Sequence, residues 1–305
     1  MHLGVVFPQI EIGADPGVVR AFAETAEGLG YDSILTYEHV LGADPARHAL
    51  VGPYTHMDAF HEPFVLFGYM AGITTTIELW LGVLVLPQRQ TALVAKQAAT
   101  LDILSGERFT LGVGVGWNQV EYHALGQDFR TRGRRFEEQI RLLRMLWGQD
   151  LVTFEGEFDQ MEAAGINHRP NRQIPLWIGG WADPVLRRIG HWADGWLASA
   201  GSPKTAHLPD RTGNPVGLAN RMKLVEAAAR EKGRDPSEIG VGMLIGDVGF
   251  EGLVPWDPAE FAHRTRVWED AGVTHSFLGT LGQDFTPAQH IAAMEEFMVA
   301  YRHGG

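Results

Sequence analysis

The segment from Leu79 to Asn118 constrains the fold most, because two apolar runs flank a single helical pattern. The runs, Leu79–Leu86 and Phe109–Val115, have the length of strands that are buried on both faces, and both contain β-branched valines. Between them, apolar residues at helical spacing predict a helix from about Ala92 to Leu104, and Ser105-Gly106 ends it. A strand, a helix and a second strand in this order form a βαβ unit, which predicts an α/β fold with a parallel sheet.

Residues that can carry chemistry follow each of these runs. Pro87–Gln90 (PQRQ) follows the first run and Gly116–Asn118 (GWN) follows the second. In parallel α/β folds, ligands bind at the carboxyl ends of the strands. The sequence therefore predicts a functional site at this edge of the sheet.

The alternation of apolar run and amphipathic helix continues along the whole chain. The predicted strands are Leu3–Phe7, Ser33–Tyr37, Leu79–Leu86, Phe109–Val115, Pro175–Ile178, Gly195–Ala198, Ile239–Ile245 and His275–Leu278. Eight strands that alternate with helices, without a linker-like break, predict an α/β fold of the (β/α)8 TIM-barrel type, with residues 1–305 as a single domain. An open doubly wound sheet is the alternative. The absence of a G-x-G-x-x-G motif at the first helix counts against its dinucleotide-binding version.

Composition narrows the possible functions. The chain has no cysteine, which removes disulfides and a thiol nucleophile, and its net charge of −12 argues against general nucleic-acid binding. No apolar run reaches membrane-spanning length, and the start MHLGVVFPQI lacks the features of a signal peptide. The expectation is a cytoplasmic protein that binds neither nucleic acid nor membrane.

Several motifs together resemble the luciferase-like monooxygenase superfamily, whose members bind FMN or the deazaflavin coenzyme F420. The matching text is FPQ near the start, LGVLVLP, AKQAATLDILSGERFTLGVGVGWN, EYHALGQDF, RTRGRRFEEQIRLLRMLW, PLWIGG and ADGW. The resemblance covers at least residues 3–200 and continues more weakly to the end. It implies a luciferase-like TIM barrel with insertion segments, a small-molecule substrate, and chemistry that a bound cofactor supplies.

The run GADP at 42–45, the later PYTHMDAFHEPF and the compact length resemble the F420-dependent branch of this superfamily. That likeness implies an oxidoreductase that uses F420 for hydride transfer to or from an organic substrate. An FMN-dependent monooxygenase is the first alternative, and a non-catalytic flavin-binding protein on the same fold is the second.

Glu38 and His39 follow the second predicted strand and are the candidate catalytic residues. Histidine titrates near neutral pH, so His39 can exchange a proton beside a reacting ring. The alternative is a structural histidine in the barrel mouth. Relatives usually carry Asp-His here, and the longer Glu38 leaves open whether it contacts the cofactor or only orients the site.

Glycines mark two further places where a cofactor could approach. Gly112, Gly114 and Gly116 alternate along the fourth strand, where a bare backbone would admit a flat ring; tight strand packing is the alternative. Gly179-Gly180 precedes a helix that Asp183-Pro184 opens, and free amides at such a turn bind anions. We expect Asp183 to cap that helix and to face away from the anion.

The resemblance implies the remaining site residues and one backbone feature. The expected cofactor-binding residues are Gln9, Thr36, His39, Leu84, Val85, Gly114, Gly116, Trp117, Gly179 and Gly180. It also implies a bulge in the third strand, with a cis peptide bond at Leu84–Val85. The aromatic residues Tyr54, Phe60, Trp117, Trp181 and Trp256 suggest an apolar pocket, although large aromatic side chains commonly serve packing.

Polar loops at 40–62 and 200–215 are candidate lids. The first contains His48, His56 and His61, whose spacing matches no standard zinc pattern, so no metal site is predicted and they are interpreted as polar loop residues. The basic run at 130–136 is interpreted as a salt-bridged face.

A homodimer is expected, because members of the family usually pair through helices of the second to fourth βα units. The apolar stripe of Phe136, Ile140 and Leu143 would extend that surface.

Overall fold

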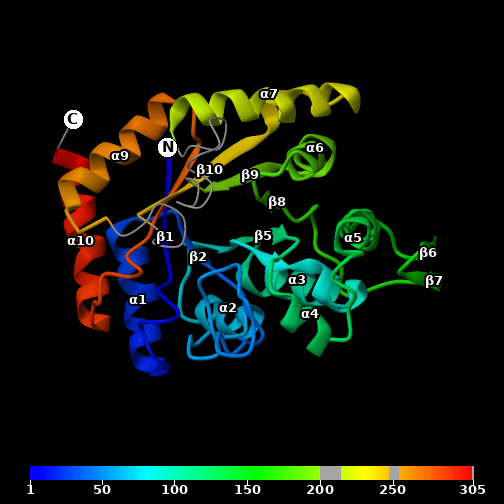
Figure 1. Ribbon diagram of the computed structural model, residues 1–305, viewed down its shortest axis with the longest axis horizontal. Helices are drawn as coiled ribbons and strands as arrows, with labels where there is room; N and C mark the ends of the chain where they lie inside the picture. Colours follow the sequence, from blue (N-terminus) through cyan, green and yellow to red (C-terminus); the bar gives the residue numbers. More distant parts are fainter. Residues whose placement is uncertain (200–213, 247–253, 304–305) are drawn as a thin grey trace.

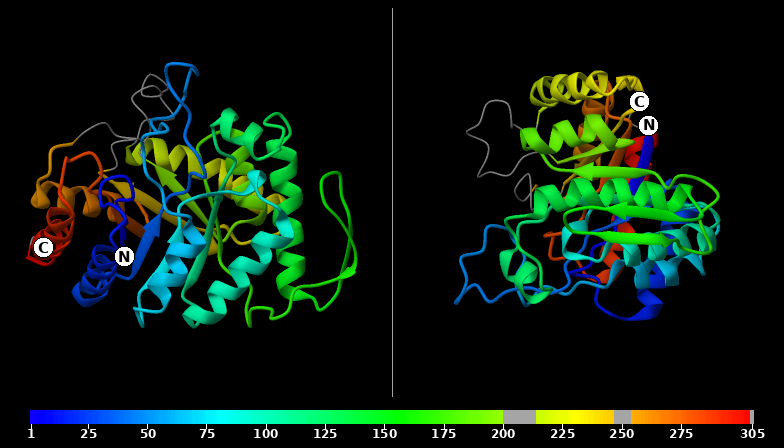
Figure 2. Two further views of the ribbon diagram at one scale, coloured as in Figure 1. Left: turned by 90° about the horizontal axis from the view of Figure 1, so that it is seen from below. Right: turned by 90° about the vertical axis from the view of Figure 1, so that its right-hand side faces the viewer.

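In the computed structural model, which describes residues 1–199, 214–246 and 254–303, parallel strands form a closed barrel that helices surround (Figures 1 and 2). Its strands are β1 (His2–Val6), β2 (Ser33–Thr36), β3 (Glu78–Leu81), β4 (Leu84–Val85), β5 (Phe109–Gly114), β8 (Leu176–Gly179), β9 (Gly195–Ser199), β10 (Gly240–Ile245) and β11 (His275–Leu278). The pairing of β3 with β5 and of β1 with β11 completes the ring. Because β4 continues the course of β3, the predicted (β/α)8 barrel is confirmed and the open sheet is wrong.

The long helices cover the outside of the barrel. They are α1 (Pro16–Leu29), α2 (Pro63–Ala71), α3 (Thr91–Ser105), α5 (Arg132–Gly148), α6 (Asp183–Trp192), α7 (Pro215–Glu231), α9 (Pro258–Asp270) and α10 (Pro287–His303). Asp15 caps α1 by accepting a hydrogen bond from the Gly17 amide, and Gly30 ends that helix in the left-handed conformation. Among the described helices, none is both long and apolar enough to span a membrane.

Apolar side chains form two cores, one inside the barrel and one between the strands and the helices. Residues that line the interior include Val6, Leu35, Trp80, Trp177, Leu197, Leu244 and Phe277. The stripe of Phe136, Ile140 and Leu143 on α5 belongs to the outer core and is buried there. The expectation that this stripe extends a dimer surface is therefore wrong, because α5 turns it towards the barrel.

Aromatic rings fill the amino-terminal end of the barrel. The His275 ring lies 4.8 Å from Trp177, 5.1 Å from Trp80 and 4.5 Å from His2, measured between ring centroids. Burial lowers the pKa of His275 to about 3, and the neighbouring His2 acts in the same direction. The residues predicted to carry chemistry lie at the opposite end, where the strands end.

A one-residue bulge separates β3 from β4 within the predicted run Leu79–Leu86. Trp80 pairs with Thr110 and Leu84 with Val113, so the three residues between them on one side face two on the other. The cis peptide bond lies at Gly82–Val83, and the prediction of Leu84–Val85 is wrong. Gly82 lies within this bulge, where a side chain would collide with β2: a Cβ there would lie 2.6 Å from Leu35 Cδ1.

An insertion between α5 and β8 forms a hairpin of β6 (Val152–Glu155) and β7 (Gln160–Ala164), which pair beside α5 (Figure 1). The buried Glu138 carboxylate of α5 holds the turn by accepting the amides of Glu157, Phe158 and Asp159 at 2.8, 2.9 and 2.6 Å. Apart from its last two residues, the predicted loop 200–215 lies outside the described residues.

The basic run at 130–136 meets the start of α5. Arg134 pairs with Glu157 of the hairpin turn, and the Arg132 guanidinium lies 3.7 Å from the centre of the Phe129 ring. A salt-bridged face is therefore confirmed for Arg134, whereas Arg132 stacks on an aromatic ring.

Candidate functional site

His39 follows β2 and lies among three aromatic rings at the carboxyl end of the barrel. Its ring centroid is 5.4 Å from Tyr54, 5.1 Å from Phe60 and 5.3 Å from Trp117. Tyr54 and Phe60 belong to loop 40–62, which stands out from the barrel (Figure 2), and Trp117 follows β5. Three of the five predicted aromatic residues therefore gather on His39.

The other two predicted aromatic residues pack elsewhere. Trp181 lies edge-on against Trp196, at 4.9 Å, and Trp256 lies 4.9 Å from Phe261 of α9. Both pack against the outer core. A tryptophan in the core and one at the candidate site are equally apolar, so residue type alone could not show that these two lie away from His39.

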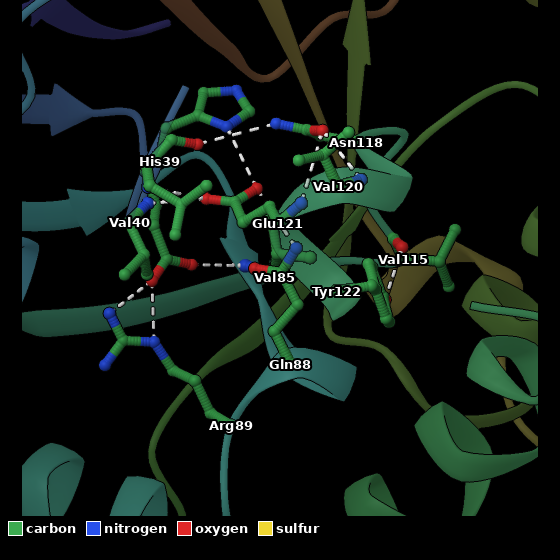
Figure 3. A network of polar contacts seen from close by, with 12 residues as sticks. His39, Val40, Val85, Gln88, Arg89, Val115, Asn118, Val120, Glu121 and Tyr122 are labelled. Carbon is green, nitrogen blue, oxygen red and sulfur yellow. Dashed lines mark hydrogen bonds and ion pairs between the residues drawn. The ribbon is translucent and has the colours of Figure 1, made fainter. Parts of the chain in front are cut away.

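Glu121, on the short helix α4 (Gln119–Ala124), holds the His39 ring from below (Figure 3). Its Oε2 lies 3.2 Å from His39 Nδ1 and accepts from Gln88 Nε2 at 3.0 Å. Its Oε1 accepts the amides of Val40 and Leu41 at 2.6 and 3.2 Å. Burial alone would raise the pKa of the Glu121 carboxyl, but hydrogen bonds from His39 and Gln88 outweigh it and lower that pKa.

The Glu38 carboxylate is buried and supports the bulged strand. Its Oε2 accepts the Val85 amide at 2.5 Å, and its Oε1 accepts Arg89 Nε at 2.6 Å. Burial raises the pKa of Glu38, while Arg89 and the Val85 amide oppose that effect. Both Glu38 oxygens accept hydrogen bonds, and arginine remains charged in proteins, so these contacts favour an ion pair between Glu38 and Arg89. This geometry favours an orienting role for Glu38.

Sequence reasoning did not find the roles of Glu121 and Arg89. Both stood in motifs that the sequence singled out, Glu121 in EYHALG and Arg89 in PQRQ after the third predicted strand. The one feature of the sequence that could have identified them is their position just after the ends of strands. Nothing in the sequence says that Glu121 contacts His39 or that Arg89 contacts Glu38.

Val83 covers the glycines of the neighbouring strands. A Cβ on Gly114 would lie 2.6 Å from Val83 Cγ2, and a Cβ on Gly179 would lie 2.8 Å from Val83 Cγ1. Gly116 is covered in the same way by Val85, and Gly112 packs against the Leu81 carbonyl. Tight packing therefore accounts for these glycines, and Val83 stands where a ring would otherwise meet bare backbone.

Gln9 and Thr36 lie together, and both are buried. Gln9 Nε2 donates to Thr36 Oγ1 at 2.6 Å and to the Tyr37 carbonyl, and Gln9 Oε1 accepts the His61 amide at 2.7 Å. These bonds join β1 and β2 to the end of loop 40–62.

Gly179 and Gly180 lead into α6, as predicted, and Gly180 has a φ of 132°. Ala182 occupies the cap position and has no side-chain hydrogen bond to the helix. Asp183 is the first helical residue and accepts Arg221 Nη2 at 2.5 Å. The prediction that Asp183 caps the helix is wrong, because the helix begins one residue earlier than Asp-Pro suggested.

Two adjacent cavities border His39 and Trp117. One, of about 340 Å³, is lined by His39, Gly42, Tyr54, Phe60 and Asn118, among others. The other, of about 490 Å³, is lined by residues that include Leu50, Val51, Trp117, Asn118 and Phe129. Asn118 borders both cavities, and the smaller one gives an organic molecule access to the His39 ring. Within the described residues, no group of three or more histidines and carboxylates could hold a metal ion.

Comparison with known proteins places these observations in a family. The family model described as luciferase-like monooxygenase matches residues 1–246. An uncharacterised protein of Mycobacterium tuberculosis is 33% identical over 280 residues, covering 88% of each chain. The F420-dependent glucose-6-phosphate dehydrogenase of Kineococcus radiotolerans is 29% identical and covers 85% of this chain and 70% of its own. The pyrimidine monooxygenase RutA of Allorhizobium ampelinum is 28% identical and covers 75% and 59%.

Solved structures share the fold along the whole chain. An F420-dependent secondary alcohol dehydrogenase, in complex with an F420-acetone adduct, superposes with a TM-score of 0.76 at 20% identity, covering 99% of both chains. The monooxygenase RslO1 from Streptomyces bottropensis gives 0.78 at 16% identity and covers 100% of both. The match to the family model over most of the chain, together with the identity to the mycobacterial relative, leads to one conclusion: this chain belongs to the luciferase-like monooxygenase family.

Proposed function

We propose that the protein is an oxidoreductase that uses coenzyme F420 for hydride transfer to or from a small organic substrate. The observation that carries this proposal is the setting of His39. Its ring stands at the carboxyl end of the barrel, with Nδ1 bonded to a buried carboxylate and three aromatic rings around it. No other candidate acid or base among the predicted site residues has such a position.

The residues present fit a flat, phosphate-bearing cofactor. Val83 offers an apolar side chain over Gly114 and Gly179, a surface on which a ring could pack. Gly180 and the start of α6, which lacks a side-chain cap, offer backbone amides suited to a phosphate. The bound deazaflavin would supply a carbon that accepts or donates a hydride.

The protein's own residues would orient and exchange protons. His39 Nε2, the ring nitrogen that does not face Glu121, would take a proton from the substrate in oxidation and return it in reduction. Tyr54, Phe60 and Trp117 would exclude water around that nitrogen. Glu38 and Arg89 would hold β4, and with it the Val83 surface, in place.

An FMN-dependent monooxygenase is the second candidate. The observation that favours it is that RutA and RslO1, both named as monooxygenases, also resemble this chain, RutA at 28% identity and RslO1 with a TM-score of 0.78. The preference for F420 rests on the better-covered dehydrogenase relative and on the run at 42–45.

The decisive experiment is titration of the purified apo-protein with F420 and FMN in parallel, following cofactor fluorescence. We expect saturable binding of F420 and much weaker binding of FMN. Preferred binding of FMN, with oxygen uptake when the cofactor is reduced, would establish the monooxygenase instead. Binding of F420 without turnover across a panel of alcohols and carbonyl compounds would favour a non-catalytic flavin-binding protein.

A further inference from the structure

We propose that Glu121 is the positioning residue of the site: it keeps the proton of neutral His39 on Nδ1, so that Nε2 is free to accept a proton from substrate. This inference deepens the proposed function and rests on His39 as the acid–base group. The sequence motifs and the family match assign no role to Glu121.

Glu121 and His39 meet in a buried, direct contact. Glu121 is fully buried, and its Oε2 lies 3.2 Å from His39 Nδ1 (Figure 3). An ionised carboxylate has no hydrogen to donate, so this contact is a hydrogen bond only when Nδ1 carries the proton. The other ring nitrogen, Nε2, is on the side of the ring away from Glu121.

The surroundings of Glu121 favour its ionised form. Three donors whose direction does not depend on the His39 tautomer point at its two oxygens: the amides of Val40 and Leu41 and the side-chain amide of Gln88. The same three bonds hold the carboxylate beside the ring.

Asn118 joins the helix that carries Glu121 to the segment that carries His39. Asn118 caps α4, because its Oδ1 accepts the amides of Val120 and Glu121 at 3.1 and 3.4 Å. The Asn118 Nδ2 also donates to the Leu41 carbonyl at 3.4 Å. The helix that follows β5 is thereby joined to the segment that follows β2, and its first turn presents Glu121 to the ring.

The chemical consequence is a defined proton path. In the oxidative direction the substrate loses a hydride from carbon to the cofactor and a proton from its hydroxyl or amine to His39 Nε2. The imidazolium that forms then faces the Glu121 negative charge at hydrogen-bond distance, which stabilises it. In the reductive direction the same proton passes from Nε2 back to the product, and Glu121 keeps Nδ1–H throughout.

The test begins with the wild-type protein and needs no turnover. Long-range ¹H–¹⁵N NMR of histidine side chains at alkaline pH distinguishes the two neutral tautomers, and loss of one signal set in His39→Gln assigns His39. We expect the Nδ1–H tautomer. A wild-type signal with the proton on Nε2 would overturn the proposal, whatever cofactor the protein binds.

The variant Glu121→Gln adds a functional readout. Its amide NH₂ can donate to Nδ1 while its oxygen keeps accepting the Val40 amide, so we expect the ring proton to move to Nε2. The rate kcat should fall by about 10²-fold or more, with little change in KM, because substrate contacts are retained. Full kcat in Glu121→Gln, beside an inactive His39→Ala, would overturn the positioning role but leave the proposed function standing.

Glu138→Gln is the matched control. Glu138 is also a buried carboxylate that accepts several backbone amides, but it holds the β6–β7 turn, away from His39. It should lower stability and leave kcat and the His39 tautomer unchanged. An equal loss of kcat in both variants would mean that Glu121 acts only through stability, which would also overturn the proposal.

Discussion

At the scale of single residues, an ordinary histidine becomes a candidate acid–base group through what surrounds it. One ring nitrogen of His39 is bonded to Glu121, and three aromatic rings border the rest. The adjacent Glu38 turns the other way and pairs with Arg89 below the bulged strand. These neighbours in sequence thus make different contacts, His39 with Glu121 and Glu38 with Arg89.

Replacing His39 by Ala should lower turnover by about 10²-fold or more, because the proton acceptor is lost. Steady-state kinetics with F420 and an accepted substrate would measure the effect, with circular dichroism to check the fold. Wild-type rates in this variant would remove His39 from the mechanism.

Replacing Arg89 by Met should destabilise the protein by about 3–5 kcal/mol, because the buried Glu38 carboxylate loses its partner. The free energy of unfolding from urea titration measures this. The double variant Glu38→Gln with Arg89→Met is the control, and it should recover part of the loss. A cost below about 1 kcal/mol for Arg89→Met would show that the pair is not a buried ion pair in solution.

At the scale of elements, loop 40–62 is fastened to the barrel at both ends. Glu121 accepts the amides of Val40 and Leu41 at its start, and Gln9 accepts the amide of His61 at its end. Within the loop, Gly42 packs directly on the backbone of Thr55. These contacts give the loop one conformation, in which it carries two aromatic rings to His39.

Replacing Gly42 by Ala should open this loop, because a Cβ would collide with the Thr55 carbonyl, which is backbone and cannot turn aside. Trypsin should then cleave faster after Arg47, an exposed residue of the loop, and KM should rise. Gly28→Ala on α1 is the control, since a Cβ there meets nothing within 4 Å. That control should keep wild-type cleavage and gain about 0.5–1 kcal/mol of stability. Equal cleavage of both variants would contradict the expectation.

At the scale of the whole molecule, the two ends of the barrel differ. The rings of His2, Trp80, Trp177 and His275 fill the amino-terminal end, and the candidate site lies at the carboxyl end. The closed end contains two neutral imidazoles, and burial lowers the pKa of both His275 and His2. The open end collects residues that follow β2, the β3–β4 bulge and β5. The buried imidazoles and the candidate site therefore lie at opposite ends of the barrel axis.

Acid should destabilise the protein through His275. Its pKa is about 3 when folded and near the ordinary 6.5 when unfolded, so the unfolded chain binds the proton more readily. The stability that depends on neutral His275 is complete above about pH 6.5 and is lost as the pH falls towards 3. Urea unfolding at pH 5 and pH 7.5 measures the difference, and His275→Phe should reduce it. An unchanged difference in that variant would assign the acid sensitivity to other groups.

A homodimer remains a prediction at this scale. Val65 of α2 and Leu104 of α3 are each 73% exposed, on helices of the predicted pairing region. Sedimentation at micromolar concentration should give twice the mass of the 33.6 kDa chain, and Leu104→Glu should reduce it. Leu151→Glu, at a residue 65% exposed next to the hairpin, should leave the mass unchanged. A 33.6 kDa species for the wild type would disprove the dimer.

The sequence by itself determined the order of strands and helices, because period and length of apolar runs are local properties. It also directed attention to the strand ends and to His39. The resemblance to a family suggested a bulge in the third strand with its cis bond at Leu84–Val85, and the structure has that bond at Gly82–Val83 instead. The packing of Leu35 from the neighbouring strand leaves no room for a side chain at Gly82, a constraint that the sequence does not reveal.

Only the tertiary structure decided which residues share a site. Glu121 reaches His39 across 82 positions of sequence, and Arg89 reaches Glu38 across 51. Periodicity carries no information about such pairs, because they form when barrel closure brings the ends of separate βα units to one edge. Closure of the barrel also places Trp181 and Trp256 against the outer core and Trp117 beside His39, although all three are tryptophan. The sequence determines the chemistry of each side chain, and the tertiary structure determines which residues that side chain contacts.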